Sequence, residues 1–323
     1  MRVQVIGLGG IGKNLLRLIY EKNGLINSKI GEKIEVVSVS DTSGTVVTDG
    51  MSLLRIVQAK EYGGLRELDS FERISATKAI EDIDSDAVIE LTQSTLDGKP
   101  GIDHALRAME NGKDVITANK GILVSGKDVI RESIEMRRIM KYEATVCGSI
   151  PVFNLMKYSI APASISEVEG FFNGTSTFVA SMMEAGKSRE DAIREAVKMG
   201  LAEKNYKDDL EGRDSARKGV ILHRTIFGSM ISMKDVVFGD MDEEPKIGKR
   251  LLTLVGKEGV SVRYVDMNGN VNRNKLTGPT MSITFHTDIV DNLTLSVEHD
   301  GPRESAATVL NDIMLTALEK SRK

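Results

Sequence analysis

The feature that most constrains the fold of this chain is a glycine motif, GLGGIG, at residues 7–12. The segment before it, RVQVI, reads as a short buried strand. The segment after it, KNLLRLIYEK, carries its leucine and isoleucine residues on one helical face. A glycine motif between a strand and a helix is typical of the first turn of a doubly wound α/β sheet.

Three glycines of this motif have the spacing G-x-G-x-x-G. Gly7 would form the tight turn, Gly9 would let the backbone approach a pyrophosphate, and Gly12 would let helix and strand pack closely. The phosphates would lie at the N-terminus of the helix. The alternative is a glycine-rich turn without a ligand. We expect NAD or NADP to bind to the whole motif, which consists of Gly7, Leu8, Gly9, Gly10, Ile11 and Gly12.

A second buried strand is predicted at residues 34–40, and it ends at Asp41. An acid at this place could bind the adenine ribose diol of NAD. Asp41 lies further from the glycines than the usual ~20 residues, because residues 22–33 resemble an inserted loop. No arginine directly follows the strand to bind a 2′-phosphate, which favours NAD. Asp41 could equally be an ordinary turn aspartate.

Polar residues also follow two later predicted strands, at residues 87–92 and 114–119. Open α/β sheets bind ligands at the carboxyl ends of their strands. These ends supply four further candidates for cofactor binding: Thr92, Ser94, Asn119 and Lys120. Lys120 could also hold a substrate carboxylate, or it could be a surface lysine.

The alternation of strands and helices predicts a Rossmann-type, doubly wound parallel sheet as the first domain. We expect this nucleotide-binding domain to span residues 1–148 and to be completed by a C-terminal helix at 301–323. Its last strand is predicted at residues 142–146. Residues 149–300 are expected to form an α+β domain with an antiparallel sheet, for substrate binding and dimerisation.

The most highly charged part of the chain is residues 200–218, GLAEKNYKDDLEGRDSARK. We expect one helix over 208–228, with Asp214 and Lys218 on the same face because they are four residues apart. An exposed ion pair would contribute only a few tenths of a kcal/mol and have no function. The helix continues into the apolar GVILHRTIFG, so its charged start is more typical of a cleft.

Composition excludes several classes of protein. The 323 residues carry a net charge of −4 and only 4% aromatic residues, which argues against nucleic acid or an anionic membrane as a partner. No apolar run approaches the roughly 20 residues of a membrane span, and the N-terminus does not read as a signal peptide. The single cysteine, Cys147, suits a reducing cytoplasm, and the four histidines show no metal-ligand spacing.

Several motifs together resemble the homoserine dehydrogenase family over nearly the whole chain. The motifs are GLGGIG (7–12), TANKG (117–121), EATVCGSIP (143–151), NGT (173–175) and the charged segment at 200–218. The length matches the short form of the family, with neither an aspartate-kinase region nor a C-terminal regulatory domain. Cys147 stands where the family usually has a glycine.

The resemblance implies an NAD(P)-dependent enzyme that interconverts L-aspartate 4-semialdehyde and L-homoserine, in threonine, methionine and isoleucine biosynthesis. It implies that Lys218 passes a proton to the aldehyde oxygen, supported by Asp209. Glu203 and Asp214 would hold the substrate ammonium.

The same resemblance implies that Lys120 lies at the substrate carboxylate. It also implies a substrate pocket lined by Gly174 and Thr175, to which we add Tyr206 from the charged segment. Glu143 and the backbone at Val146 would match a monovalent cation site (Na⁺ or K⁺). A homodimer, or a dimer of dimers, is expected.

Two other functions remain open from the sequence. The same fold could serve a different amino-acid or amino-aldehyde dehydrogenase. A dinucleotide-binding sensor without turnover would belong to another class of protein, but such a sensor has no need of the proton donor Lys218.

Overall fold

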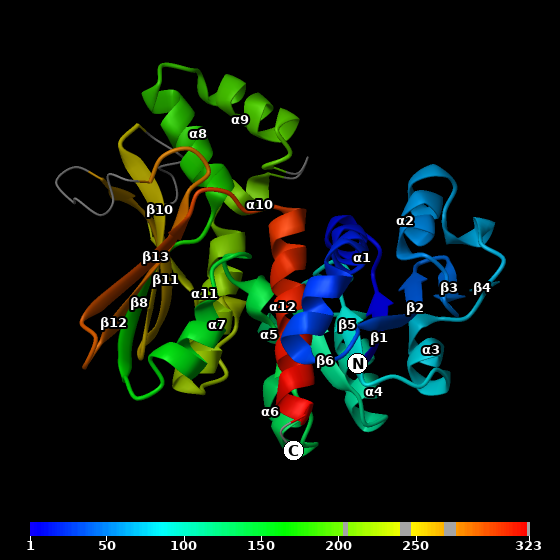
Figure 1. The fold of residues 1–323 in the computed structure, drawn as a ribbon. Helices are drawn as coiled ribbons and strands as arrows, with labels where there is room; N and C mark the ends of the chain where they lie inside the picture. Colours follow the sequence, from blue (N-terminus) through cyan, green and yellow to red (C-terminus); the bar gives the residue numbers. More distant parts are fainter. Residues whose placement is uncertain (203–205, 240–246, 268–275, 322–323) are drawn as a thin grey trace. The chain divides into compact units, whose positions relative to one another are not determined.

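A computed structural model describes residues 1–202, 206–239, 247–267 and 276–321. The chain divides into two compact units, which are described separately (Figure 1). Unit 1 consists of Met1–Thr145 and Pro302–Lys323, and unit 2 consists of Val146–Gly301. Glu203, predicted to bind substrate, lies outside the described residues.

Unit 1 is built on a seven-stranded sheet in the order β4-β3-β2-β1-β5-β6-β7. Strands β2, β1, β5, β6 and β7 are parallel, whereas β3 and β4 add an antiparallel edge. The strand order therefore reverses at β1, which confirms the doubly wound sheet. The strands are β1 (Arg2–Ile6), β2 (Glu35–Asp41), β3 (Gly44–Val47), β4 (Phe71–Glu72), β5 (Ala87–Glu90), β6 (Asp114–Thr117) and β7 (Met140–Lys141).

The helices of unit 1 include one from the end of the chain, α12, which packs beside α1 (Figure 1). Val309 and Ile313 of α12 are fully buried in the same core as Leu15 and Leu16 of α1. The helices are α1 (Gly10–Ile30), α2 (Leu53–Tyr62), α3 (Ala76–Asp82), α4 (Gly101–Glu110), α5 (Lys120–Val124), α6 (Val129–Glu135) and α12 (Pro302–Ser321), with short 3-10 turns η1 (Leu65–Glu67) and η2 (Glu143–Thr145).

Two local predictions for unit 1 are wrong. Residues 22–33 are not an inserted loop, because α1 continues to Ile30 and ends at Gly31 in the left-handed conformation. Ile26 is buried on this last stretch of α1, so packing against the core extends the helix past the loop-like composition. Residues 142–146 do not form a strand, since the backbone N–H of Glu143 donates to Asp312 of α12 at 3.0 Å instead of to a sheet.

Unit 2 contains a six-stranded sheet in the order β13-β12-β8-β10-β11-β9. Its pairs are antiparallel, as expected, except for the short β9, which runs parallel to β11. The strands are β8 (Ile165–Phe171), β9 (Val237–Phe238), β10 (Lys249–Gly256), β11 (Gly259–Asp266), β12 (Met281–Thr287) and β13 (Asn292–Val297).

The helices of unit 2 cover one face of this sheet through α8 and α11 (Figure 1). Gly219 of α11 allows a close approach, because a Cβ there would lie 2.7 Å from Val260 and 2.9 Å from Thr253. The helices are α7 (Val152–Asn154), α8 (Gly174–Glu184), α9 (Arg189–Lys198), α10 (Lys207–Leu210) and α11 (Arg213–Phe227), with a π-helical turn η3 (Leu155–Ser159) and a 3-10 turn η4 (Met233–Asp235).

The prediction of a single helix over residues 208–228 is also wrong. Gly212 adopts φ 74°, a left-handed conformation that separates α10 from α11. Asp209 therefore lies on a different helix from Asp214 and Lys218. Over the described ranges of the chain, no helix combines the length and the apolar character that crossing a membrane requires.

Candidate active site

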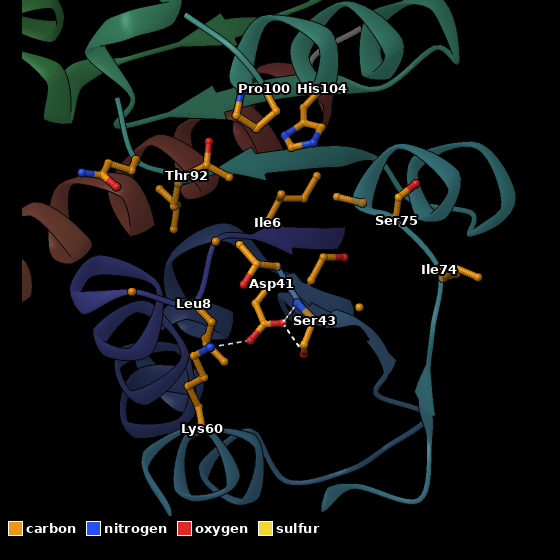
Figure 2. A pocket seen from close by; sticks show the side chains of 18 of the residues that line it. Ile6, Leu8, Asp41, Ser43, Lys60, Ile74, Ser75, Thr92, Pro100 and His104 are labelled. Carbon is orange, nitrogen blue, oxygen red and sulfur yellow. Dashed lines mark hydrogen bonds and ion pairs between the residues drawn. The ribbon is translucent and has the colours of Figure 1, made fainter. Parts of the chain in front are cut away.

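A cavity of about 600 Å³ opens in unit 1 beside the carboxyl ends of β1, β2 and β5 (Figure 2). This volume lies within the range of cofactor sites, and the place is where the strand order reverses. The cavity wall includes five of the predicted cofactor residues, namely Gly7, Leu8, Gly9, Asp41 and Thr92.

The three motif glycines occupy positions with different steric demands. Gly7 has φ +100°, and a Cβ there would lie 2.5 Å from the carbonyl of Leu91. At Gly12 a Cβ would lie 2.2 Å from the carbonyl oxygen of Gly7. At Gly9 a Cβ would meet nothing within 4 Å, so this backbone borders open space in the cavity wall. The turn thus needs Gly7 and Gly12 for its own packing and leaves the backbone of Gly9 open to the cavity.

The N-terminus of α1 is suited to an anion. Gly9 caps this helix without a side chain, and its first turn contains no acidic residue. The first N–H groups of a helix have no partner within the helix, and the helix dipole favours negative charge at this end. The motif therefore fits the pyrophosphate of a dinucleotide.

Asp41 is the last residue of β2, and its side chain lines the cavity (Figure 2). Its Oδ1 accepts hydrogen bonds from the N–H of Ser43 at 2.7 Å and from its hydroxyl at 2.6 Å, while Oδ2 pairs with Lys60. Burial raises the pKa of Asp41, but the hydrogen bonds from Lys60 and Ser43 outweigh burial and hold the pKa below its ordinary value. Asp41 is therefore an ionised carboxylate that also shapes its turn.

Two cations of this cavity were missed by sequence reasoning. Lys60, on α2, and Arg73, just after β4, both line the wall. This end of the cavity therefore carries positive charge, although no arginine directly follows β2. Neither residue is close to Asp41 in the sequence. The packing of α2 against α1 and the pairing of the edge strands β3 and β4 beside β2 bring them to this cavity.

The remaining cofactor candidates are placed elsewhere. Asn119 caps α5 by accepting from the N–H of Gly121 at 2.9 Å, and its Nδ2 donates to Oγ1 of Thr92 at 3.2 Å. Lys120 is the first residue of α5 and is half-buried, while Ser94 is exposed. The N-terminal residues of α1 continue the glycine turn outside the cavity wall, and these are Gly10, Ile11 and Gly12.

Unit 2 contains a buried lysine–aspartate pair. The Lys218 Nζ lies 2.8 Å from Oδ2 of Asp214, one turn earlier on α11. The same Nζ donates to the carbonyl oxygen of Phe172, the residue just after β8, at 2.5 Å. The pair is not the exposed ion pair of the alternative interpretation, because the side chains are only 10% and 15% exposed.

The electrostatic surroundings keep Lys218 protonated. Burial lowers the pKa of this ammonium, but the nearby Asp214, Cys147 and Asp300, together with the hydrogen bond to Asp214, raise the pKa well above its ordinary value. A protonated lysine held in place by a carboxylate is suited to donate a proton to a developing alkoxide.

The sequence did not predict that Cys147 and Asp300 affect the pKa of Lys218. Cys147 is fully buried and has φ +53°, a conformation that favours glycine. Asp300 lies so close to Gly148 that a Cβ there would be 2.1 Å from its Oδ1. The backbone of this turn therefore admits the Asp300 carboxylate only because residue 148 has no side chain.

Asp209 is linked to the same region through Asn173. Its Oδ1 accepts from Nδ2 of Asn173 at 2.7 Å, and Asn173 caps α8 by accepting from the N–H of Ser176 at 2.8 Å. Asn173 directly follows Phe172, the residue whose carbonyl binds Lys218. Asn173 thus connects Asp209 to the start of α8, next to the residue that accepts the hydrogen bond of Lys218.

The substrate-pocket candidates Gly174 and Thr175 form the first turn of α8. A Cβ at Gly174 would lie 2.8 Å from the carbonyl oxygen of Pro279. The hydroxyl of Thr175 donates to the carbonyl oxygen of Leu201 at 2.9 Å. Tyr206 is half-buried and packs with the apolar residues of α8 and α9, so a packing role accounts for the contacts of its ring.

Other charges of the 200–218 segment form a separate cluster. Asp208 accepts from Arg213 at 2.7 Å and from Arg217 at 2.9 Å. Asp208 is about a third exposed, so this cluster fits the structural interpretation better than a catalytic one. Glu143, the cation candidate, is buried at the end of unit 1, and Val146 begins unit 2.

The glycine turn, the doubly wound sheet and the buried lysine–carboxylate pair define a dehydrogenase of the Rossmann class. The model of the homoserine dehydrogenase family matches residues 151–314. The chain is 31% identical to a homoserine dehydrogenase of Methanocaldococcus jannaschii, with 97% of this chain and 98% of the relative covered. The chain therefore belongs to the homoserine dehydrogenase family.

Two further relatives agree with this assignment. An NAD(+)-dependent homoserine dehydrogenase of Pseudomonas canavaninivorans is 28% identical, with 100% of this chain and 97% of the relative covered. The crystal structure of a homoserine dehydrogenase from Thermoplasma acidophilum has a TM-score of 0.85 and is 30% identical, with 98% of each chain covered.

Proposed function

We propose that this protein is an NAD(P)-dependent homoserine dehydrogenase that interconverts L-aspartate 4-semialdehyde and L-homoserine. The observation that carries the proposal is the buried pair of Lys218 and Asp214 in a chain of this family. A reaction that reduces an aldehyde needs a proton donor at the aldehyde oxygen, and the raised pKa of Lys218 keeps that proton available.

The cofactor assigned to unit 1 is NAD or NADP. Gly7 and Gly12 shape the turn, Gly9 leaves its backbone accessible, and the start of α1 receives the pyrophosphate. Asp41 is assigned to the adenine ribose, with Lys60 beside it. When bound, the nicotinamide supplies or accepts the hydride.

The residues of unit 2 are assigned to the substrate. Lys218 donates its proton to the aldehyde oxygen during reduction and accepts a proton from the hydroxyl of homoserine during oxidation. The carbonyl oxygen of Phe172 and Asp214 orient the Nζ of Lys218 and compensate its charge. Asp209 acts through Asn173, which fixes the start of α8.

The substrate has an ammonium and a carboxylate, so its site needs both signs of charge. Asp214 and Glu203 are assigned to the ammonium, and Lys120 to the carboxylate. Gly174, Thr175 and Tyr206 are assigned to the pocket wall. Apart from Lys120, these substrate residues belong to the sequence of unit 2, so we assign unit 2 as the substrate domain and unit 1 as the nucleotide-binding domain.

Three further assignments complete the proposal. Glu143 and the backbone of Val146 are assigned to a monovalent cation. The protein is proposed to act in the cytoplasm, where the single thiol of Cys147 stays reduced. It is proposed to assemble as a homodimer or a dimer of dimers.

The test is to incubate the purified protein with L-homoserine and either NAD⁺ or NADP⁺ and to record the absorbance of the reduced coenzyme. L-Serine and L-threonine serve as matched substrates with the same charged groups and a different hydroxyl position. We expect reduction with L-homoserine and little with the other two. No homoserine-dependent reduction with either coenzyme would refute the proposed function.

A further inference from the structure

Outside the proposed active site, two carboxylates and an imidazole meet on one face of the unit 2 sheet. Glu167 and Glu169 are alternate residues of β8, so their side chains share a face. His286 of β12 is directly opposite Glu167 in the strand register. One ligand atom from each residue lies within 4.8 Å of the others. This group is the Glu–Glu–His cluster.

The cluster lies on the face opposite to the helices α8 and α11. Thr253 and Val260 on β10 and β11 face Gly219 of α11. The register pairs Thr253 with Gly170 of β8, the neighbour of Glu169 in the chain. Successive residues of a strand point to opposite faces, so Glu169 and its partners point away from α11. Within unit 2, the cluster is thus separate from Lys218.

The imidazole of His286 is oriented by the next strand. Its Nδ1 lies 2.7 Å from Oδ1 of Asn292, the residue opposite it on β13. An amide oxygen can only accept, so Nδ1 carries the proton and donates it to Asn292. In the neutral ring, Nε2 then has a free lone pair, and this lone pair is turned towards the carboxylates.

The Nε2 atom of His286 is shielded from solvent and makes no hydrogen bond to any residue that the structure describes. It lies 3.3 Å from Oε1 of Glu169. A lone pair against a carboxylate oxygen at this distance is repulsive unless a proton or a metal ion lies between them.

We propose that Glu167, Glu169 and His286 form a binding site for a divalent transition-metal ion, of which zinc is the representative. Zinc takes imidazole nitrogen and carboxylate oxygen ligands at roughly 2.0–2.1 Å, and tetrahedral ligands at that distance are about 3.3 Å apart. The Nε2 of His286 and the Oε1 of Glu169 are separated by 3.3 Å. Three protein ligands leave a fourth position for water or another donor.

The contact between His286 and Asn292 is the arrangement that metal-binding histidines need. A ligating imidazole usually donates its other N–H to an oxygen acceptor, which fixes the tautomer and the direction of the ring. Asn292 supplies that acceptor here. The imidazole ligand favours zinc and its neighbours in the first transition row over Mg²⁺, which prefers oxygen ligands. A bound ion would connect β8 to β12 and stabilise the folded protein.

The test uses the full chain without a histidine tag, after treatment with a chelator and its removal. Titration calorimetry with zinc chloride should give saturable binding of one ion per chain. His286→Ala and Glu169→Gln should each lower the affinity at least tenfold. Asn292→Ala keeps all three ligands and should lower the affinity by roughly 10–100-fold. His299→Ala, which removes an exposed histidine outside the cluster, should leave zinc binding unchanged.

Other results would contradict the proposed metal site. If no saturable binding occurs, or if His286→Ala binds zinc as tightly as the wild type, the cluster is an ordinary ion pair of His286 and Glu169 and the proposal is wrong. Magnesium chloride at the same concentration should not compete, and full competition would contradict the choice of metal. Circular dichroism of each variant tests whether it is folded, so that a loss of zinc binding can be distinguished from unfolding. Zinc binding is read without turnover, so this test is independent of the proposed dehydrogenase activity.

Discussion

The ammonium of Lys218 and the carboxylate of Asp214 lie 2.8 Å apart on consecutive turns of α11, at the buried end of a helix that packs on the unit 2 sheet. A second carboxylate, that of Asp300 near the end of the unit 2 sequence, also raises the pKa of this ammonium through its negative charge. Both carboxylates favour the charged form of Lys218. The surroundings therefore set the pH range in which this lysine can exchange its proton.

Replacement of Asp300 by asparagine should change the pH dependence of homoserine oxidation. Lys218 must be neutral to accept a proton, so oxidation should become faster as pH rises. Removing the charge of Asp300 lowers the pKa of Lys218, and the rise should move to lower pH. The measurement is kcat/KM for L-homoserine across the neutral to alkaline range. The exposed neighbour Glu298 gives the control, and equal profiles for Asp300→Asn and Glu298→Gln would contradict the role of Asp300.

Two alanine substitutions in the glycine motif should affect different properties, one the stability of the protein and the other its binding of the coenzyme. Gly12→Ala places a methyl group 2.2 Å from the Gly7 oxygen, so it should lower the free energy of unfolding by about 3 kcal/mol. Gly9→Ala meets nothing within 4 Å and should leave stability unchanged. It should instead weaken coenzyme binding at least tenfold, because its methyl group occupies the space of the ligand. Chemical denaturation and coenzyme titration measure the two effects, and equal destabilisation by both substitutions would argue against this division.

Coenzyme choice should depend on Asp41 and Lys60 in opposite directions. Asp41→Ala removes the acceptor for a ribose diol and frees Lys60, so the KM for NAD⁺ should rise far more than the KM for NADP⁺. Lys60→Ala should impair NADP⁺ more than NAD⁺, because it removes a positive charge of the cavity wall. Steady-state kinetics with both coenzymes give the four values. Equal changes for the two coenzymes in Asp41→Ala would rule out a ribose contact.

Arg250 and Glu184 should contribute to the stability of unit 2. Arg250 is 4% exposed, and its two terminal nitrogens each lie 2.8 Å from a carboxylate oxygen of Glu184. Arg250→Ala leaves that carboxylate without its cation and should cost about 3 kcal/mol. Urea denaturation measures this loss. Exposed ion pairs contribute little, so Arg194→Ala, which disrupts an exposed pair, is the matched control and should change stability by less than about 1 kcal/mol.

The same pair predicts an acid-sensitive part of the stability. Hydrogen bonds and the charge of Arg250 outweigh partial burial and hold the pKa of Glu184 below its ordinary value. A lowered folded-state pKa stabilises the protein above the unfolded-state pKa, and this contribution is lost as pH falls through the folded-state value. The difference in unfolding free energy between wild type and Arg250→Ala should therefore shrink at acid pH. A difference that does not depend on pH would contradict this linkage.

The sequence predicted those features that depend on local pattern. The glycine turn, its strand and its helix lie within one continuous segment, so their chemistry could be inferred from residue spacing. The position of Lys218 four residues after Asp214 likewise determines that they share a helical face. In both cases the backbone conformation follows from neighbours in the chain.

Features that depend on packing between distant segments could not be predicted. Lys60 on α2 and Arg73 just after β4 line the cavity although they are far from Asp41 in the sequence. Asp300 raises the pKa of Lys218 although it is far from Lys218 in the sequence. The break at Gly212 had a visible signal, since glycine favours a left-handed turn, but the helical charge pattern around it outweighed that signal. The Glu–Glu–His cluster has no sequence signature, because strand pairing alone brings β8 and β12 together.

The most direct test of the account is the rate of homoserine oxidation by Lys218→Ala, with Lys207→Ala as its control. Lys207 is an exposed lysine on α10, so its loss should leave kcat near the wild-type value. Loss of the proton-transferring residue should lower kcat by roughly 10²–10⁴-fold while coenzyme binding is retained. If Lys218→Ala oxidises L-homoserine at nearly the wild-type rate, the role assigned to Lys218 is wrong.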